Sequence, residues 1–179
     1  MTITLIGYRG VGKSTIAPLL ASRLGWNWAD VDALIEQQAG RSIAEIFAAE
    51  GEPGFRAREA GVLSELLSQD RLIIAAGGGA ILDPHSRQAI RHAGPAIWLT
   101  ASLDSIFARV HGDVTTAGRR PSLTGTDPRT EIETLLAIRT PLYAETATQT
   151  VDTEARSPAA IVDEIVFALP RSLTNGSPR

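Results

Sequence analysis

Residues 7–14 read Gly7-Tyr8-Arg9-Gly10-Val11-Gly12-Lys13-Ser14, which is the G-x-x-x-x-G-K-[ST] spacing of a phosphate-binding loop. The glycines permit φ > 0, so that successive backbone N–H groups turn toward the phosphates. Lys13 is the only lysine among the 17 lysine and arginine residues, so the chain keeps a lysine where this loop needs one. The motif predicts a nucleoside triphosphate site, with Lys13 on the β- and γ-phosphates and Ser14 on Mg²⁺.

The segments on either side of the loop are those that the motif requires. Thr2–Ile6 is β-branched and apolar, as a buried strand should be. Residues 14–24 have apolar side chains at helical spacing, and a helix that begins at Lys13 adds its positive end to the phosphate site. A glycine-rich turn that contains Lys-Ser by chance is the alternative, which this order of elements disfavours. We expect ATP to contact Gly10, Val11, Gly12, Lys13, Ser14 and Thr15.

Composition restricts the protein to a few classes. The chain has 179 residues, of which 44% are hydrophobic and 21% charged, and this fits one globular domain. The absence of cysteine excludes disulfides and thiolate catalysis, and agrees with a cytoplasmic location. A net charge of −3 argues against nucleic-acid binding, and no apolar run is long enough to span a membrane. We expect no signal peptide, because a strand begins at Thr2.

Strand-like and helix-like segments alternate along the chain, which predicts an α/β fold with a largely parallel sheet. The predicted strands are Thr2–Ile6, Trp26–Asp30, Leu72–Ala76, Ala96–Leu99 and Thr148–Val151. Helix starts are predicted by a capping box at Ser42 and by the pairs Asp83-Pro84, Asp127-Pro128 and Ser157-Pro158. We expect one domain, residues 1–169, and a flexible tail over residues 170–179.

Two segments interrupt this alternation. Residues 41–68 contain more chain than one crossover helix needs, and we expect two helices separated at residues 51–54. Residues 111–127 are rich in glycine and threonine and include Arg119 and Arg120. A mobile surface loop is one interpretation of this second segment. We favour an arginine-bearing lid that closes over phosphates, because long loops in compact domains are often functional.

Two carboxylates follow the second predicted strand. Its carboxyl end should open on the same edge of the sheet as the phosphate loop. In an extended segment Asp30 and Asp32 would point the same way, toward the γ-phosphate. One carboxylate could bind Mg²⁺, and the other could accept a proton from an attacking hydroxyl. The alternative is that one of them only caps the next helix, and their division of roles stays open.

The third predicted strand runs into Gly77-Gly78-Gly79, where a second nucleotide motif would normally end in aspartate. This absence makes Asp30 and Asp32 the candidate magnesium ligands together with Ser14. Three glycines leave the backbone amides open to close approach by a substrate. A plain turn is the competing interpretation.

Arginines near the two insertions are candidate carboxylate ligands. Arg56 and Glu59 are three residues apart on a predicted helix, so Glu59 can hold the guanidinium in place. Arg58 lies about 200° around the same helix and cannot point into the same site. A surface ion pair is the commoner explanation for Arg56 taken alone, and Arg139 is equally uninformative alone. Pro141 should kink or end the helix and fix the direction of Arg139.

Six motifs together resemble the shikimate kinase family over residues 1–169. They are GYRGVGKS at residues 7–14, D-x-D at 30–32, GFRARE at 54–59, AAGGGAI at 75–81, RPSLTG at 120–125 and RTPLY at 139–143. The resemblance implies a P-loop fold like that of nucleoside monophosphate kinases, with a five-stranded parallel sheet. It also implies phosphorylation of the 3-hydroxyl of shikimate by MgATP, in the pathway to chorismate and the aromatic amino acids.

The resemblance implies roles for individual residues on the acid side of the site. Asp32, Arg56 and Arg139, with Gly78 or Gly79, would bind shikimate, and the two arginines would hold its carboxylate. Asp32 would contact the reacting hydroxyl and is the family's candidate base.

On the ATP side, Arg120 would be the lid arginine on the transferred phosphate and, with Lys13, a catalytic residue. Arg109 and the loop 152–158 match the region that holds adenine. The form RPSL replaces the commoner RPLL and the loop before it is long, which leaves open whether Arg119 or Arg120 acts. The expected partners are shikimate and ATP, and we expect a monomer.

Two rival functions deserve comparison with this one. A kinase that acts on gluconate or a nucleotide shares the phosphate loop, but a nucleotide kinase should carry a base-recognition segment where this chain has Gly77–Ala80. A nucleotide-binding module without catalysis should have lost the D-x-D pair or the arginines, and neither is lost.

Overall fold

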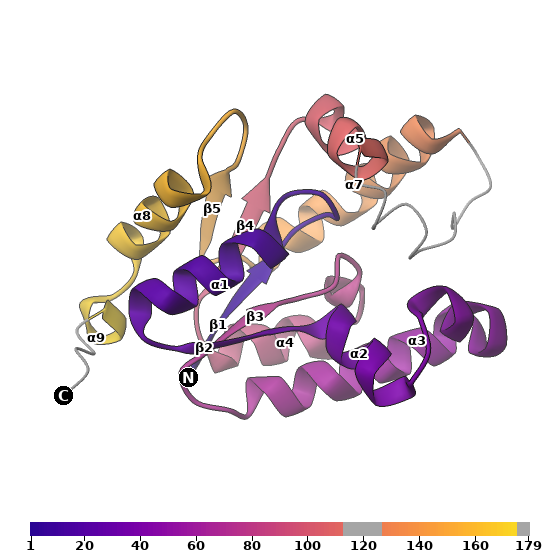
Figure 1. Ribbon diagram of the computed structural model, residues 1–179, viewed down its shortest axis with the longest axis horizontal. Helices are drawn as coiled ribbons and strands as arrows, with labels where there is room; N and C mark the ends of the chain where they lie inside the picture. The colour runs from indigo at the N-terminus through magenta and orange to yellow at the C-terminus, as the bar shows by residue number, and fades with distance from the viewer. Residues whose placement is uncertain (113–126, 175–179) are drawn as a thin grey trace.

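A five-stranded parallel sheet forms the centre of the protein (Figure 1). The computed structural model describes residues 1–112 and 127–174. The strand order is β2-β3-β1-β4-β5, and each neighbouring pair is parallel. The strands are β1 (Thr2–Ile6), β2 (Asn27–Asp30), β3 (Leu72–Ala75), β4 (Ala96–Thr100) and β5 (Gln149–Asp152). The α/β class and all five predicted strands are confirmed, and no strand end differs from its prediction by more than one residue.

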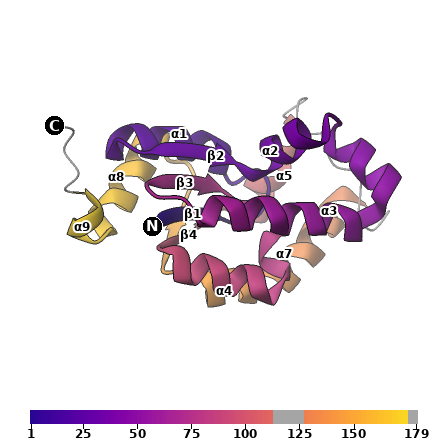
Figure 2. The same ribbon diagram turned by 90° about the horizontal axis from the view of Figure 1, so that it is seen from below.

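Helices cover both faces of the sheet (Figure 2). They are α1 (Lys13–Leu24), α2 (Val31–Ala39), α3 (Ile43–Leu67), the 3₁₀ turn η1 (Ala80–Leu82), α4 (Pro84–Ala93), α5 (Leu103–Gly112), α7 (Pro128–Thr146), α8 (Pro158–Ala168) and α9 (Arg171–Thr174). Because successive strand residues point to opposite faces, Ile3 and Leu5 pack with α1 and α8, whereas Ile6 packs with α3 and α4. Two apolar cores result, one on each side of the sheet.

Local signals fix where the helices begin and bend. The capping box is confirmed: Ser42 Oγ accepts a hydrogen bond from Glu45 N, and the Glu45 carboxylate accepts one from Ser42 N. Asp83, Asp127 and Ser157 likewise cap α4, α7 and α8, each followed by proline. The predicted break in residues 41–68 is a kink at Gly51 (φ 68°, ψ −178°) inside α3, a conformation that glycine adopts without strain.

The expected tail differs from the structure over part of its length. Arg171–Thr174 form α9, and Leu173 is 9% exposed and packs into the core beside α8. One apolar side chain therefore anchors a segment whose polar composition predicted fraying.

The parallel topology gathers the candidate residues at one edge of the sheet. The candidate residues all lie at or just after the carboxyl ends of strands. They belong to the loop after β1, the last residue of β2, the glycines after β3 and the loop after β5. Figure 1 shows α2 and α3 on one side of this edge and α5 with the start of α7 on the other. Ligands of open α/β sheets bind at such an edge.

Candidate active site

The phosphate loop connects β1 to α1. Gly10 (φ 81°) and Gly12 (φ 97°) lie in the left-handed region, as the motif predicts, and Gly12 directly precedes the first turn of α1. The ammonium group of Lys13 donates hydrogen bonds to Gly7 O at 2.7 Å and to Tyr8 O at 2.8 Å. The lysine thus lies across its own loop, beside the backbone N–H groups at the start of the helix, where an anion is favoured.

Asp30 caps the next helix, as one interpretation of the sequence proposed, and it also contacts the phosphate loop. Its Oδ1 atom caps α2 by accepting hydrogen bonds from Asp32 N at 3.0 Å and Ala33 N at 3.3 Å. Its Oδ2 atom accepts a hydrogen bond from Ser14 Oγ at 2.6 Å. One carboxylate therefore holds the start of α2 and lies next to the serine of the phosphate loop.

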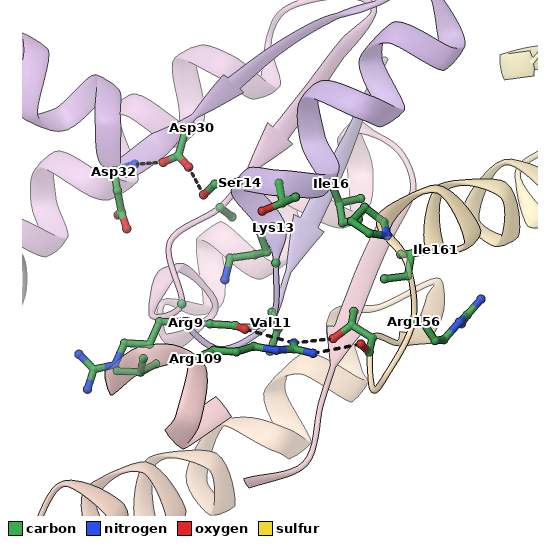
Figure 3. A pocket seen from close by; sticks show the side chains of 18 of the residues that line it. Arg9, Val11, Lys13, Ser14, Ile16, Asp30, Asp32, Arg109, Arg156 and Ile161 are labelled. Carbon is green, nitrogen blue, oxygen red and sulfur yellow. Dashed lines mark hydrogen bonds between the residues drawn. The ribbon is translucent and has the colours of Figure 1, made fainter. Parts of the chain in front are cut away.

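Asp32 reaches the site by a different geometry from the one expected. The strand ends at Asp30, and Asp32 already belongs to the first turn of α2, so the two carboxylates are not on one extended segment. The helix turn nevertheless brings Asp32 to the same cavity as Asp30 and Lys13 (Figure 3). The expectation of a shared direction along a strand was wrong, while the shared location is confirmed.

A cavity of about 540 Å³ joins these groups to a second, more apolar region. Figure 3 shows Asp32 at one end, Arg156 and Ile161 at the other, and Lys13 between them. Val11, Ile16, Val110 and Ile161 supply apolar lining. This combination suits a ligand with a charged end and a flat apolar end.

Arg56 is held by two carboxylates on its own helix. Its guanidinium forms ion pairs with Glu59 at 2.6 Å and with Glu52 at 3.0 Å, so the predicted Arg56–Glu59 pair is confirmed. Burial alone would lower the pKa of Arg56, but the Glu59 and Glu52 carboxylates outweigh it and raise the pKa. Arg58 instead pairs with Glu50, away from this group, as the helix geometry predicted.

The glycines after β3 bring the two candidate acid-binding arginines together. The Arg56 guanidinium packs directly against Gly79: a Cβ built there would lie 2.3 Å from its Nη1 atom. Arg139, which is 5% exposed, donates from Nη1 to Gly78 O at 3.3 Å. Neighbouring glycines therefore contact one arginine each, and the plain-turn interpretation does not explain this arrangement.

Tyr143 was missed as part of this group. Its hydroxyl donates to Gly78 O at 2.6 Å, and its ring stacks on Trp98 with centroids 5.7 Å apart. The sequence did contain a signal, because Tyr143 follows Arg139 by four residues and shares its helix face. Pro141 lies inside α7, which continues to Thr146, so the proline does not end the helix.

Arg109 connects the phosphate loop to the loop after β5. It donates to Gly10 O at 3.3 Å, to Thr153 Oγ1 at 3.0 Å and to Thr153 O at 3.1 Å. Thr153, which is 3% exposed, in turn donates to Thr100 O at 2.9 Å. Glu154 accepts hydrogen bonds from Ser102 N and Ser105 Oγ at the start of α5. The family resemblance indicated Arg109 and the loop 152–158, but it did not single out Thr153 or Glu154 within that loop.

Some predicted features fall elsewhere. Arg119 and Arg120, with most of the expected lid, lie outside the described residues. Across residues 1–112 and 127–174, no cluster of three or more histidines or acidic residues could hold a metal ion by itself. Over the same ranges, the helices are all too short or too polar to span a membrane.

Comparison with known proteins now gives the family. A family model described as shikimate kinase matches residues 9–170. A shikimate kinase of Rhodopirellula baltica is 46% identical over 94% of this chain and 90% of its own length, and one of Symbiobacterium thermophilum is 44% identical over 94% and 96%. The solved structure of the shikimate kinase from Acinetobacter baumannii in complex with shikimate superposes with a TM-score of 0.88 at 34% identity, covering 99% of this chain and 95% of that one. This chain belongs to the shikimate kinase family.

Proposed function

We propose that the protein transfers the γ-phosphoryl group of ATP to the 3-hydroxyl of shikimate, giving shikimate 3-phosphate and ADP on the route to aromatic amino acids. The observation that carries the proposal is the pair of arginines held against neighbouring glycines, beside a phosphate loop, in a chain of this family. Two guanidinium groups at that position fit an acceptor that carries an anionic group and do not fit a neutral sugar.

ATP lies along the cavity with its phosphates on residues 10–15 and its base toward the loop after β5. Lys13 lies where the β- and γ-phosphates would pass, and Arg109 fixes the adenine side through Thr153. The apolar lining from Val11, Ile16 and Ile161 suits a purine ring better than a phosphate. These contacts orient the nucleotide along the cavity.

Ser14, Asp30 and Asp32 fit a magnesium ion that arrives with ATP. The 2.6 Å contact of Ser14 Oγ with Asp30 Oδ2 places two hard oxygen donors together, the type that Mg²⁺ prefers. Nucleotide phosphates and water would supply the remaining ligands of an ion held by these side chains. When bound, the ion supplies neutralisation of phosphate charge.

Shikimate presents its carboxylate to Arg56 of α3 and Arg139 of α7, which contact the neighbouring glycines Gly79 and Gly78. A guanidinium can donate two parallel hydrogen bonds to a carboxylate, and the Glu59 pair keeps Arg56 from swinging away. Binding of the carboxylate by the two arginines orients the ring hydroxyls of shikimate toward Asp32 and the phosphate loop.

The transfer step requires few groups. The 3-hydroxyl oxygen attacks the γ-phosphorus, the bond from phosphorus to the β–γ bridging oxygen breaks, and its electron pair stays on ADP. Asp32 accepts the hydroxyl proton, while Lys13 and the lid arginine, Arg120 or its neighbour Arg119, stabilise the charge on the moving phosphoryl group. One chain supplies all of these residues, so the proposed enzyme acts as a monomer. The absence of cysteine suits a reducing cytoplasm.

A matched pair of substitutions tests the acid site. Arg56→Lys keeps the charge but loses the fork geometry, so KM for shikimate should rise by roughly 10-fold while KM for ATP stays within about 2-fold. Arg58→Lys is the control, because Arg58 lies on the same helix and pairs with Glu50. Steady-state rates of ADP release measure both. A rise confined to the ATP KM of Arg56→Lys, or an equal rise in both variants, would refute the assignment.

A further inference from the structure

Arg9 is a cation of the phosphate loop that has no role in the transfer step described so far. It is the third residue of the loop, half-buried, and it lines the cavity. In Figure 3 it lies at the same end of the cavity as Asp32, away from Arg156 and Ile161. It therefore faces the acceptor side of the site and not the adenine side.

The other described arginines of the cavity are committed to protein acceptors. Arg109 donates to Gly10 O and to Thr153. Arg156 donates to Asp152 O at 3.0 Å and forms an ion pair with Glu164 at 2.5 Å. Arg9 forms no ion pair with any described carboxylate, and within the described part of the chain its buried Nε has no hydrogen-bond acceptor. A buried guanidinium donor without an acceptor is costly, so a ligand acceptor is expected.

The neighbour of Arg9 does not neutralise it. The Cζ atom of Arg9 lies 6.0 Å from the centroid of the Tyr8 ring, and that of Arg139 lies 5.6 Å from the same ring. Burial raises the pKa of Tyr8, and the nearby Glu131 carboxylate adds to the rise. The charges of Arg9 and Arg139 and a hydrogen bond from Arg9 act in the opposite direction but do not outweigh burial, so the phenol stays protonated. Two guanidinium groups thus flank one neutral ring, which leaves this end of the cavity favourable for an anion.

The backbone position narrows the choice of anion. Arg9 N lies 3.4 Å from where a Cβ of Gly78 would be, so residue 9 is at the junction of the phosphate loop and the glycine segment. Arg56 and Arg139 already contact the glycines and provide two forks for a carboxylate. The anion that passes between the phosphate loop and Asp32 is the transferred phosphoryl group.

We propose that Arg9 is a phosphate ligand on the acceptor side, which binds the phosphoryl group as it leaves ATP and then as the phosphomonoester of the product. This inference rests on the proposed function. It adds a cation that belongs to the phosphate loop itself. Because the charge is engaged only after the β–γ bond lengthens, Arg9 affects turnover and product affinity, and it leaves ADP affinity unchanged.

Arg9→Gln and Arg9→Lys are compared with Arg23→Gln, which removes a positive charge from the exposed end of α1. Arg9→Gln should lower kcat on the order of 100-fold and weaken shikimate 3-phosphate by about 10-fold, with Kd for MgADP and KM for shikimate within about 2-fold. Arg9→Lys should recover part of both losses, since it keeps the charge without the fork. Arg23→Gln should match the wild type. Calorimetric titration with product and with MgADP, beside steady-state rates and thermal unfolding, gives these values.

Three outcomes would overturn the inference. A loss of shikimate affinity equal to the loss of product affinity would assign Arg9 to the carboxylate, and weaker MgADP would assign it to the nucleotide. Unchanged kcat and product affinity in both Arg9 variants would show that Arg9 does not bind the phosphoryl group. Failure of the proposed function looks different, because the wild-type protein would then release no ADP with shikimate, and both proposals would fall together. If Arg9→Gln unfolds, Arg9→Lys alone decides, through its ratio of product to MgADP affinity.

Discussion

Gly79→Ala tests how the glycine segment holds the acid-binding arginine. A Cβ at this position would lie 2.3 Å from Arg56 Nη1 and 2.5 Å from both Cζ and Nη2. Since such contacts are too short, the guanidinium must shift by about 1 Å, a displacement that is enough to cost about 100-fold at a reacting site. The clashing atoms are the end of a flexible side chain, so folding should suffer little.

The magnitude follows from the contacts of Arg56. The shifted guanidinium loses at least one charge-assisted hydrogen bond to the carboxylate, worth about 1.5–3 kcal/mol, or roughly 10- to 100-fold in KM for shikimate. The effect on KM for ATP should stay within about 2-fold, because the phosphate loop is untouched. Steady-state kinetics with each substrate varied in turn gives both values.

Gly61→Ala is the control for this substitution. Gly61 lies later in α3 with open space around its Cβ position, so alanine there should leave both KM values unchanged and add up to about 1 kcal/mol of stability. Unchanged shikimate KM in Gly79→Ala, with the fold intact, would refute the claim that Arg56 must rest on Gly79 to bind the acid.

Three other predictions concern single groups. Lys13→Ala should reduce turnover on the order of 1,000-fold with an unchanged circular dichroism spectrum, and near-normal rates would contradict the assigned phosphate contact. Thr153→Val removes the hydroxyl that accepts a hydrogen bond from Arg109. The affinity for MgADP should fall in a titration, and the free energy of unfolding in urea should fall by about 1–3 kcal/mol. Unaltered ADP affinity would show that this contact does not contribute to nucleotide binding. Hydrogen bonding from Ser86 holds the pKa of Asp83 below its usual 3.8, so its contribution to stability is present above that pH and lost as the pH falls through the folded value. Asp83→Asn should therefore show a smaller drop in Tm between pH 6 and pH 3, and an equal drop would contradict this.

Contacts that depend on local spacing were predictable from the sequence. The capping box at Ser42 and the Arg56–Glu59 pair join residues three apart, a separation that helix geometry fixes without knowledge of the fold. The phosphate loop is equally local. The break at Gly51 followed from its glycine and proline context.

Contacts between distant segments were not predictable in this way. The hydrogen bonds of Arg109 with Thr153 and of Tyr143 with Gly78 join residues far apart in the chain, and neither residue type nor spacing indicates such a partner. The position of Asp32 shows that prediction from local sequence is also limited at element boundaries. A shift of one residue decides whether β2 continues or α2 begins, and this determines the direction of the Asp32 side chain. The α/β order fixed which loops share an edge, but only packing fixed which atoms meet there.

The choice of acceptor is the most direct test of whether this protein phosphorylates shikimate. We would measure ADP release from MgATP by the purified protein with shikimate, quinate, gluconate and AMP supplied separately. We expect a large stimulation by shikimate, formation of shikimate 3-phosphate in equal amount to ADP, and little or no stimulation by gluconate or AMP. Stimulation by gluconate or AMP instead, or ATP binding with no stimulation by any of the four, would contradict it.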